Sequence, residues 1–94
     1  MLYAIICHDK KNGAPIRAEN RPLHLEYLKG FAGQAHAVGP MLGDDEASMV
    51  GSLLIMNFDS KADAESFAAG DPYAKAGLFE SVVVTAWKQV LPAL

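Results

Sequence analysis

The stretch "NRPLHLEYLKGFAGQ", residues 20–34, lies between two apolar segments and decides the fold. Asn20 can cap a helix that runs from Arg21 to about Gln34, because Pro22 then falls in the first turn, where its missing N–H costs nothing. The apolar residues of the stretch recur at spacings of three and four, which predicts one buried stripe. That stripe comprises Leu25, Leu28, Phe31 and Ala32.

Strand-sized apolar segments flank this helix on both sides. The expected strands are residues 2–7, 35–42, 52–58 and 78–90, with polar connections between them. Ser60 opens a second helix that stops at Gly70, and Asp63 lies near the positive end of its dipole. Asp71 can then cap one further short turn that Gly77 terminates.

The resulting element order is β-α-β-β-α-β. This order predicts an α+β, ferredoxin-like fold, in which a four-stranded antiparallel sheet carries both helices on one face. The first, third and last strands are apolar on both sides, yet the helices can bury only one face of the sheet. A second copy of the chain, packed sheet to sheet, would cover the other face, so we expect a homodimer.

Length and composition exclude several classes of protein. The 94 residues predict a single domain over residues 1–94, because so short a chain builds one hydrophobic core. A net charge of −3 argues against a nucleic-acid partner. No apolar run reaches the length of a membrane span and no signal peptide is evident, so we expect a cytoplasmic protein without a membrane partner. The one cysteine, Cys7, is expected in the core.

Two residues are candidates for acid-base chemistry. His24 falls at the first turn of the expected helix, where a carboxylate could hold its imidazole and make it a general base. A surface histidine without a role is the alternative. Asp71 could be that carboxylate, although its position before Pro72 and Tyr73 also suits a helix cap.

Further residues could line the same pocket. Arg21 could fix a carboxylate or phenolate and Tyr73 could stack on a flat ligand, or they could be an ordinary solvated arginine and a boundary tyrosine. Asp9 could face the pocket or cap the turn that follows it. His36, on the second strand, competes with His24 as the base if it lines the pocket. The histidines and the cysteine share no metal-ligand spacing, and no nucleotide-binding motif occurs, so neither a metal nor a cofactor is expected.

Taken together, the segments "MLYAIICHDK", "RPLHLEYL", "GPML" and "DPYAKAGLFESV" and the closing tryptophan resemble the YCII-related family of small bacterial proteins. The resemblance covers nearly the whole chain. It implies a ferredoxin-like fold that pairs into a dimeric α/β barrel, and an enzyme with a histidine–aspartate pair in a pocket between sheet and helices. The matching positions are His24 and Asp71.

The resemblance also suggests a type of reaction. A characterised branch of the family removes chloride from a chlorinated, hydroxylated ring without metal or organic cofactor. The reaction type it implies for this chain is proton transfer at an acidic ring or enol carbon, of the lyase, isomerase or dehydrohalogenase kind. A non-catalytic module that binds a small ligand in the same pocket is the alternative function.

Overall fold

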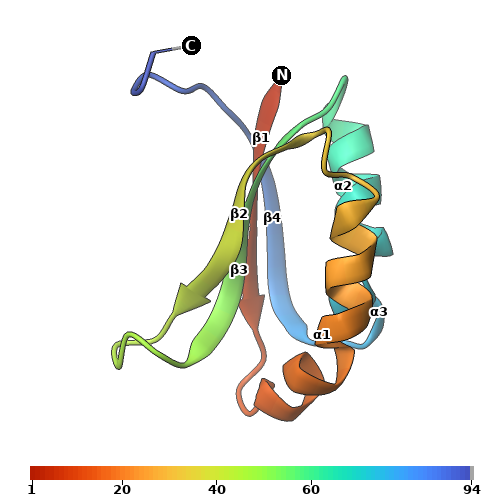
Figure 1. Ribbon diagram of the computed structural model, residues 1–94, viewed down its shortest axis with the longest axis vertical. Helices are drawn as coiled ribbons and strands as arrows, with labels where there is room; N and C mark the ends of the chain where they lie inside the picture. The colour runs from red at the N-terminus through yellow and green to blue at the C-terminus, as the bar shows by residue number, and fades with distance from the viewer. Residues whose placement is uncertain (94) are drawn as a thin grey trace.

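In the computed structural model, which describes residues 1–93, four strands form one antiparallel sheet with the strand order β2-β3-β1-β4. Three helices all cover the same face of this sheet (Figure 1). The elements are β1 (Leu2–Asp9), α1 (Ala14–Lys29), β2 (Ala35–Leu42), β3 (Met49–Asn57), α2 (Lys61–Gly70), α3 (Pro72–Lys75) and β4 (Phe79–Trp87). The predicted ferredoxin-like architecture is confirmed.

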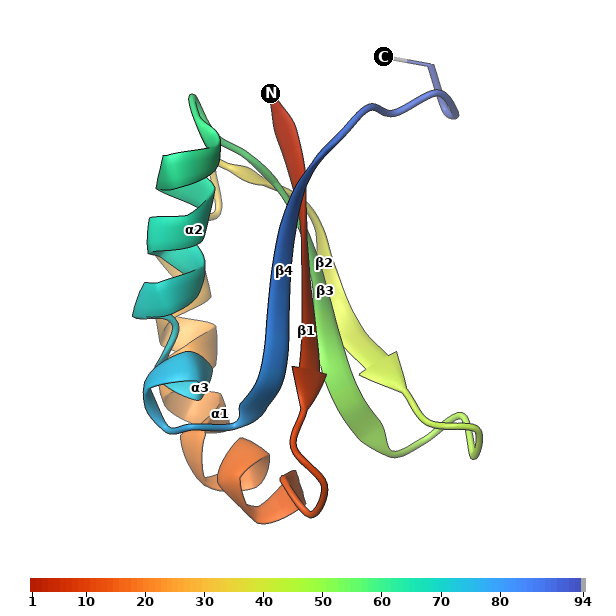
Figure 2. The ribbon, with the colours of Figure 1, turned by 180° about the vertical axis from the view of Figure 1, so that it is seen from behind.

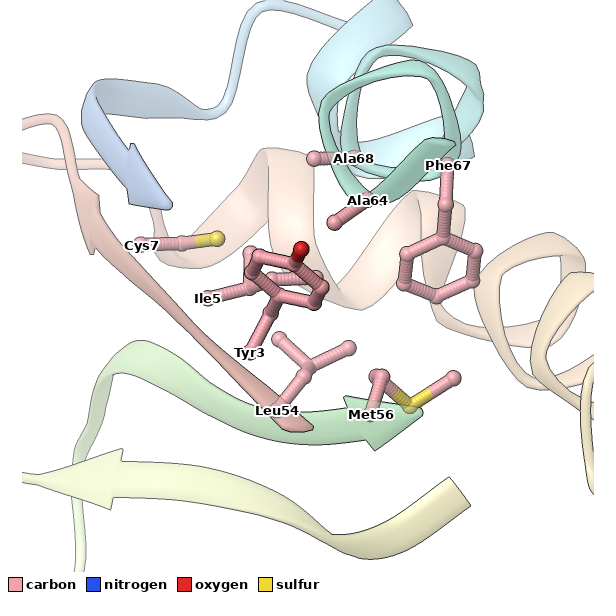
Figure 3. Packing of buried hydrophobic residues seen from close by; sticks show 8 residues of the cluster. All are labelled: Tyr3, Ile5, Cys7, Leu54, Met56, Ala64, Phe67 and Ala68. Carbon is pink, nitrogen blue, oxygen red and sulfur yellow. The ribbon is translucent and has the colours of Figure 1, made fainter. Parts of the chain in front are cut away.

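The hydrophobic core lies between the two central strands and the helices (Figure 3). Alternate residues of a strand point to the same face of a sheet, so every second side chain of β1 and β3 enters the core. The buried side chains are Tyr3, Ile5 and Cys7 of β1, Leu54 and Met56 of β3, and Ala64, Phe67 and Ala68 of α2. The expected core position of Cys7 is confirmed.

The first helix begins seven residues earlier than predicted, at Ala14 instead of Arg21. Asn12 adopts a left-handed conformation with φ of 63°, and Pro15 then lies in the first turn. Pro22 is inside the helix, and the first turns of α1 lie at an angle to the rest (Figure 1), as an interior proline permits. The prediction that Asn20 caps the helix is therefore wrong. Asn20 lies inside α1, and its side-chain amide donates to the Ile16 carbonyl.

The buried face of α1 also differs from the predicted apolar stripe. The helix ends at Lys29, and Ala32 is exposed in the turn that follows. The buried side chains of α1 are Arg17 and His24, both polar. The helix therefore directs its polar residues, and not only its apolar ones, toward the sheet.

The other boundaries follow the sequence more closely. The second strand spans residues 35–42 as predicted, and the Ser60 side chain caps α2 by accepting a hydrogen bond from the Asp63 amide at 3.1 Å. The third strand begins at Met49, three residues before the prediction, because Met49 already pairs with Leu42. The last strand ends at Trp87 and does not continue to residue 90.

The face of the sheet opposite the helices carries apolar side chains. Ile6 pairs with Leu53 on one side and with Val83 on the other, and its neighbours in β1, Ile5 and Cys7, point into the core. Leu53 is 38% exposed and Val83 is 51% exposed. No helix covers this side in either view (Figures 1 and 2). Within residues 1–93 no helix is long and apolar enough to cross a membrane.

Candidate functional site

The imidazole of His24 contacts the carboxylate of Asp71 across 47 positions of sequence. Nδ1 of His24 lies 2.9 Å from Oδ1 and 3.0 Å from Oδ2 of Asp71, and both side chains are buried. Asp71 follows the last residue of α2 and also caps α3, because its Oδ1 accepts a hydrogen bond from the Tyr73 amide at 2.9 Å. A carboxylate acceptor at Nδ1 requires the proton on that nitrogen, which leaves the lone pair on Nε2.

Nε2 of His24 is available to a ligand. It forms no hydrogen bond with any group in residues 1–93, and no fully buried side-chain nitrogen or oxygen there lacks a partner. Nε2 is therefore accessible, and His24 lines a cavity of about 310 Å³ between α1 and the sheet. An oriented imidazole with a free nitrogen in a cavity can give or take a proton.

Tyr73 packs against the histidine as well as against Arg17. Its ring stacks on the His24 imidazole with centroids 3.9 Å apart and an angle of 15° between planes. Burial raises the pKa of the Tyr73 phenol above its usual value, although the positive charges of Arg17 and Arg21 partly offset this effect. The phenol therefore stays protonated at neutral pH and can donate a hydrogen bond.

Arg17 is a buried residue of this site that the sequence analysis missed. Its Nε and Nη2 donate to the two carboxylate oxygens of Asp9 at 2.8 and 2.9 Å, and Nη2 also donates to Ser52 Oγ at 3.1 Å. Burial opposes the charge of Arg17, but the hydrogen bonds and the charge of Asp9 outweigh it and raise its pKa. Arg17 precedes His24 by seven residues, two helical turns, and this spacing would have been the signal if α1 had been predicted from Ala14.

The cavity combines a few polar groups with an apolar wall. The polar lining comprises Arg17, Arg21, His24, Ser52 and Tyr73, and the apolar lining includes Leu25, Leu28, Val38, Pro40, Met49 and Leu54. Arg21 is exposed and forms no ion pair within residues 1–93, whereas Arg17 is paired with Asp9. Among the described residues, the cavity therefore offers an unpaired cation, Arg21, on the same lining as the imidazole.

Two other candidates from the sequence lie outside this lining. Asp9 uses both carboxylate oxygens on Arg17 and is not among the residues that line the cavity. His36 is exposed on β2 and does not line it either. The structure thus brings His24, Asp71 and Tyr73 together, with Arg21 on the same cavity.

A larger hollow, of about 410 Å³, lies at the end of α1, away from the histidine. It is lined by the aromatic residues Tyr27, Phe31, Phe58 and Phe67 and by polar residues that include Asp59 and Asp63. No histidine lines it, and Tyr27 uses its hydroxyl to donate to the Phe67 carbonyl. The smaller cavity, which has the oriented imidazole, is the better candidate for chemistry.

No group of three or more histidine, cysteine or acidic side chains in residues 1–93 could hold a metal ion. Cys7 is close to the site, but its thiol is not reactive. Burial, followed by the negative charges of Asp71 and Asp9, raises the pKa of its thiol to about 12. It therefore remains a neutral thiol at physiological pH.

Comparison with known proteins identifies relatives over nearly the whole chain. Residues 1–88 match the YCII-related domain. Protein YciI of Escherichia coli is 36% identical over an alignment of 97 residues, which covers 96% of this chain and 99% of that protein. An uncharacterized protein of Haemophilus influenzae is 32% identical over the same extent.

A solved structure is similar at the level of both sequence and fold. It is a 5-chloro-2-hydroxyhydroquinone dehydrochlorinase from Burkholderia phenoliruptrix in complex with 2,5-dihydroxybenzoquinone. It superimposes with a TM-score of 0.86 and 36% identity over 94% of each chain. By its match over residues 1–88 and by these relatives, the chain belongs to the YCII-related family.

Proposed function

We propose that this protein is a cofactor-independent enzyme that transfers a proton on a small oxygenated compound, such as a hydroxylated ring. The observation that carries the proposal is the His24 imidazole, which contacts Asp71 through Nδ1 while Nε2 is open to the cavity. This arrangement is typical of a general base whose partner carboxylate fixes the tautomer and stabilises the imidazolium.

The proposed step needs no external oxidant or reductant. Nε2 of His24 accepts the proton of a ring hydroxyl, and the O–H electron pair forms a carbonyl. The ring carbon next to the one that bears this oxygen takes the electrons of the former C=C bond and a proton from the imidazolium. The substrate has isomerised from its enol to its keto form, and the histidine is neutral again. Lyase and dehydrohalogenase reactions can begin from this keto form.

Two further groups of the cavity suit the charge that develops on the substrate oxygen. The guanidinium of Arg21 forms no ion pair in the part of the chain that the structure describes, and a planar fork of donors matches a phenolate or carboxylate. The phenol of Tyr73 keeps its proton because burial raises its pKa. Both groups would stabilise an oxyanion more strongly than the neutral ground state, which is the requirement for catalysis.

The solved relative supports the type of substrate. That protein is a dehydrochlorinase of 5-chloro-2-hydroxyhydroquinone, in complex with 2,5-dihydroxybenzoquinone. Small, flat, acidic and oxygenated rings of this kind fit a cavity of about 310 Å³ that has an apolar wall and the guanidinium of Arg21. The substrate class, and not that particular compound, is what we propose for this chain.

The test is proton exchange at carbon. Hydroxyhydroquinone is incubated without oxygen in D₂O, and loss of its ring C–H signals is followed by NMR with the wild type, His24→Gln and His36→Gln. The exposed His36 is the matched control. We expect His24→Gln to lose about 10² to 10⁴ in rate and His36→Gln to keep the wild-type rate. Equal rates for the wild type and His24→Gln would refute the proposal, and ligand binding without any exchange would favour a binding module.

We also propose that the protein is a homodimer whose two sheets pack face to face. The support is the apolar row of Leu53, Ile6 and Val83 on the face without helices, with the partly exposed Trp87 beside it. Burying this face removes apolar surface from water. Sedimentation of the wild type and of Val83→Lys measures the assembly. A wild-type monomer at micromolar concentration would contradict it, and a weaker dimer for the variant is expected.

A further inference from the structure

We infer that Arg17 is a positioning residue of the site: it clamps the ring of Tyr73 against His24 and so keeps Nε2 directed into the cavity. The inference deepens the proposed function, because it rests on His24 being the base. It concerns a residue whose Nε and Nη2 donors are engaged by Asp9 and Ser52.

The geometry that carries the inference is the Tyr73 ring, which stacks on His24 and also lies against the Arg17 guanidinium. The Tyr73 ring lies 3.9 Å from the His24 ring, centroid to centroid, and the Arg17 guanidinium carbon lies 4.8 Å from the centroid of Tyr73. Arg17 and His24 are seven residues apart in α1, on the two sides of Pro22. The Tyr73 ring therefore contacts both side chains, and these contacts contribute to its nearly complete burial.

The stack is anchored at both ends. At one end Asp71 contacts His24 through Nδ1 and accepts from the Tyr73 amide, so one carboxylate sets the positions of both stacked residues. At the other end, Asp9 and Ser52 hold the guanidinium. The four elements β1, α1, β3 and the α2–α3 junction are thereby joined around the imidazole. Without Arg17, the Tyr73 ring would lose its contact with the guanidinium.

Charge explains why an arginine paired with an aspartate suits this position. A base must accept a positive charge when it takes the proton. The oxyanion of the substrate would balance the exposed Arg21, whereas a buried cation at residue 17 without a partner would oppose the charge on the imidazole. The bidentate ion pair with Asp9 offsets the charge of Arg17 and holds the guanidinium plane rigid. A lysine would keep the charge but would have no planar face to support the ring.

The first readout needs no substrate. Stacking on Tyr73 shields the His24 ring protons, so their NMR signals lie upfield of those of a free imidazole. In Arg17→Lys we expect at least half of this upfield displacement to be lost, whereas Lys29→Gln, at an exposed residue of the same helix, should leave it unchanged. Unchanged His24 signals in a folded Arg17→Lys protein would overturn the inference and would mean that Arg17 only stabilises the fold.

A milder variant covers the case in which Arg17→Lys does not fold. Ser52→Ala removes one hydrogen bond of 3.1 Å from the guanidinium and should shift the same His24 signals in the same direction, by less. If Ser52→Ala leaves those signals in place while Arg17→Lys is unfolded, the inference is wrong.

The kinetic readout separates positioning from direct contact. In the exchange assay on hydroxyhydroquinone, Arg17→Lys should lower kcat by about 10- to 100-fold with little change in KM, because a misdirected base slows the chemical step. A raised KM with kcat unchanged would mean that Arg17 binds the ligand itself and would overturn the inference. If the His24 signals move but His24→Gln is fully active, the positioning stands and the proposed function fails.

Discussion

Replacing Asp71 by asparagine tests the proton arrangement of the site with little change of shape. Asparagine can still accept from the Tyr73 amide, which lies 2.9 Å from Oδ1 in the wild type. Its NH₂ group would face Nδ1 of His24, which the wild-type carboxylate oxygens contact at 2.9 and 3.0 Å. Because an NH₂ group donates and cannot accept, its position 3.0 Å from Nδ1 favours a lone pair on that nitrogen, and we expect the imidazole proton to move to Nε2.

The expected cost to stability is small and can be worked from these contacts. A charge-assisted hydrogen bond becomes a neutral one, which costs about 1 kcal/mol. For a domain of this size that corresponds to a fall in Tm of about 4–8 °C. Asp71→Ala should cost about 2–4 kcal/mol, because it also removes the cap of α3 and leaves a buried imidazole nitrogen without a partner.

Two measurements check the Asp71→Asn prediction. Correlation of imidazole ¹⁵N and ¹H signals reports which nitrogen of His24 carries the proton, and urea unfolding reports stability. Asp63→Asn, an exposed residue in the first turn of α2, is the control, and its stability should stay within about 0.5 kcal/mol of the wild type. If Asp71→Asn leaves the proton on Nδ1, or costs as much as Asp71→Ala, the reasoning is refuted.

Two further predictions follow from local geometry. Gly70→Ala would place a methyl group 2.5 Å from the Tyr27 hydroxyl and should cost about 1–3 kcal/mol by urea unfolding, whereas Gly33→Ala, with open space around it, should be nearly neutral; equal effects would contradict this. The side-chain hydrogen bond from Ser48, together with backbone amides, lowers the pKa of Asp45 to about 2. The turn that contains Asp45 and Ser48 should therefore be intact above the usual aspartate pKa of 3.8 and should loosen as the pH falls toward 2. Amide NMR shifts of this turn that change near pH 4 instead would disprove the prediction.

The start of α1 illustrates a limit of reasoning from local patterns. Pro15 and Pro22 are both compatible with a first turn, and the sequence alone favoured the later one, with Asn20 as cap. The structure begins the helix at Ala14 and accepts an interior proline, because the earlier turns carry Arg17 into contact with Asp9. A long-range ion pair is invisible to a rule that considers three or four neighbouring residues.

In the candidate site, too, the sequence indicated single residues but not the long-range contacts between them. The resemblance to a known family pointed to His24 and Asp71, and the spacing after α2 marked Asp71 as a cap, which it is. Neither indicated that the Tyr73 ring would lie on the imidazole and against the Arg17 guanidinium. These contacts depend on how the two helical segments meet over the sheet, and not on any local pattern.

The sequence by itself determined the order of the elements and the caps at Ser60 and Asp71. Strand alternation and capping are local: a side chain meets the backbone two or three residues away, and this holds before the chain has folded. The contact between His24 and Asp71, 47 positions apart, and the pairing of Arg17 with Ser52, 35 positions apart, were decided only by the tertiary structure. Such contacts exist only once the sheet and helices have packed, because burial removes water as the competing partner and makes each polar pairing necessary.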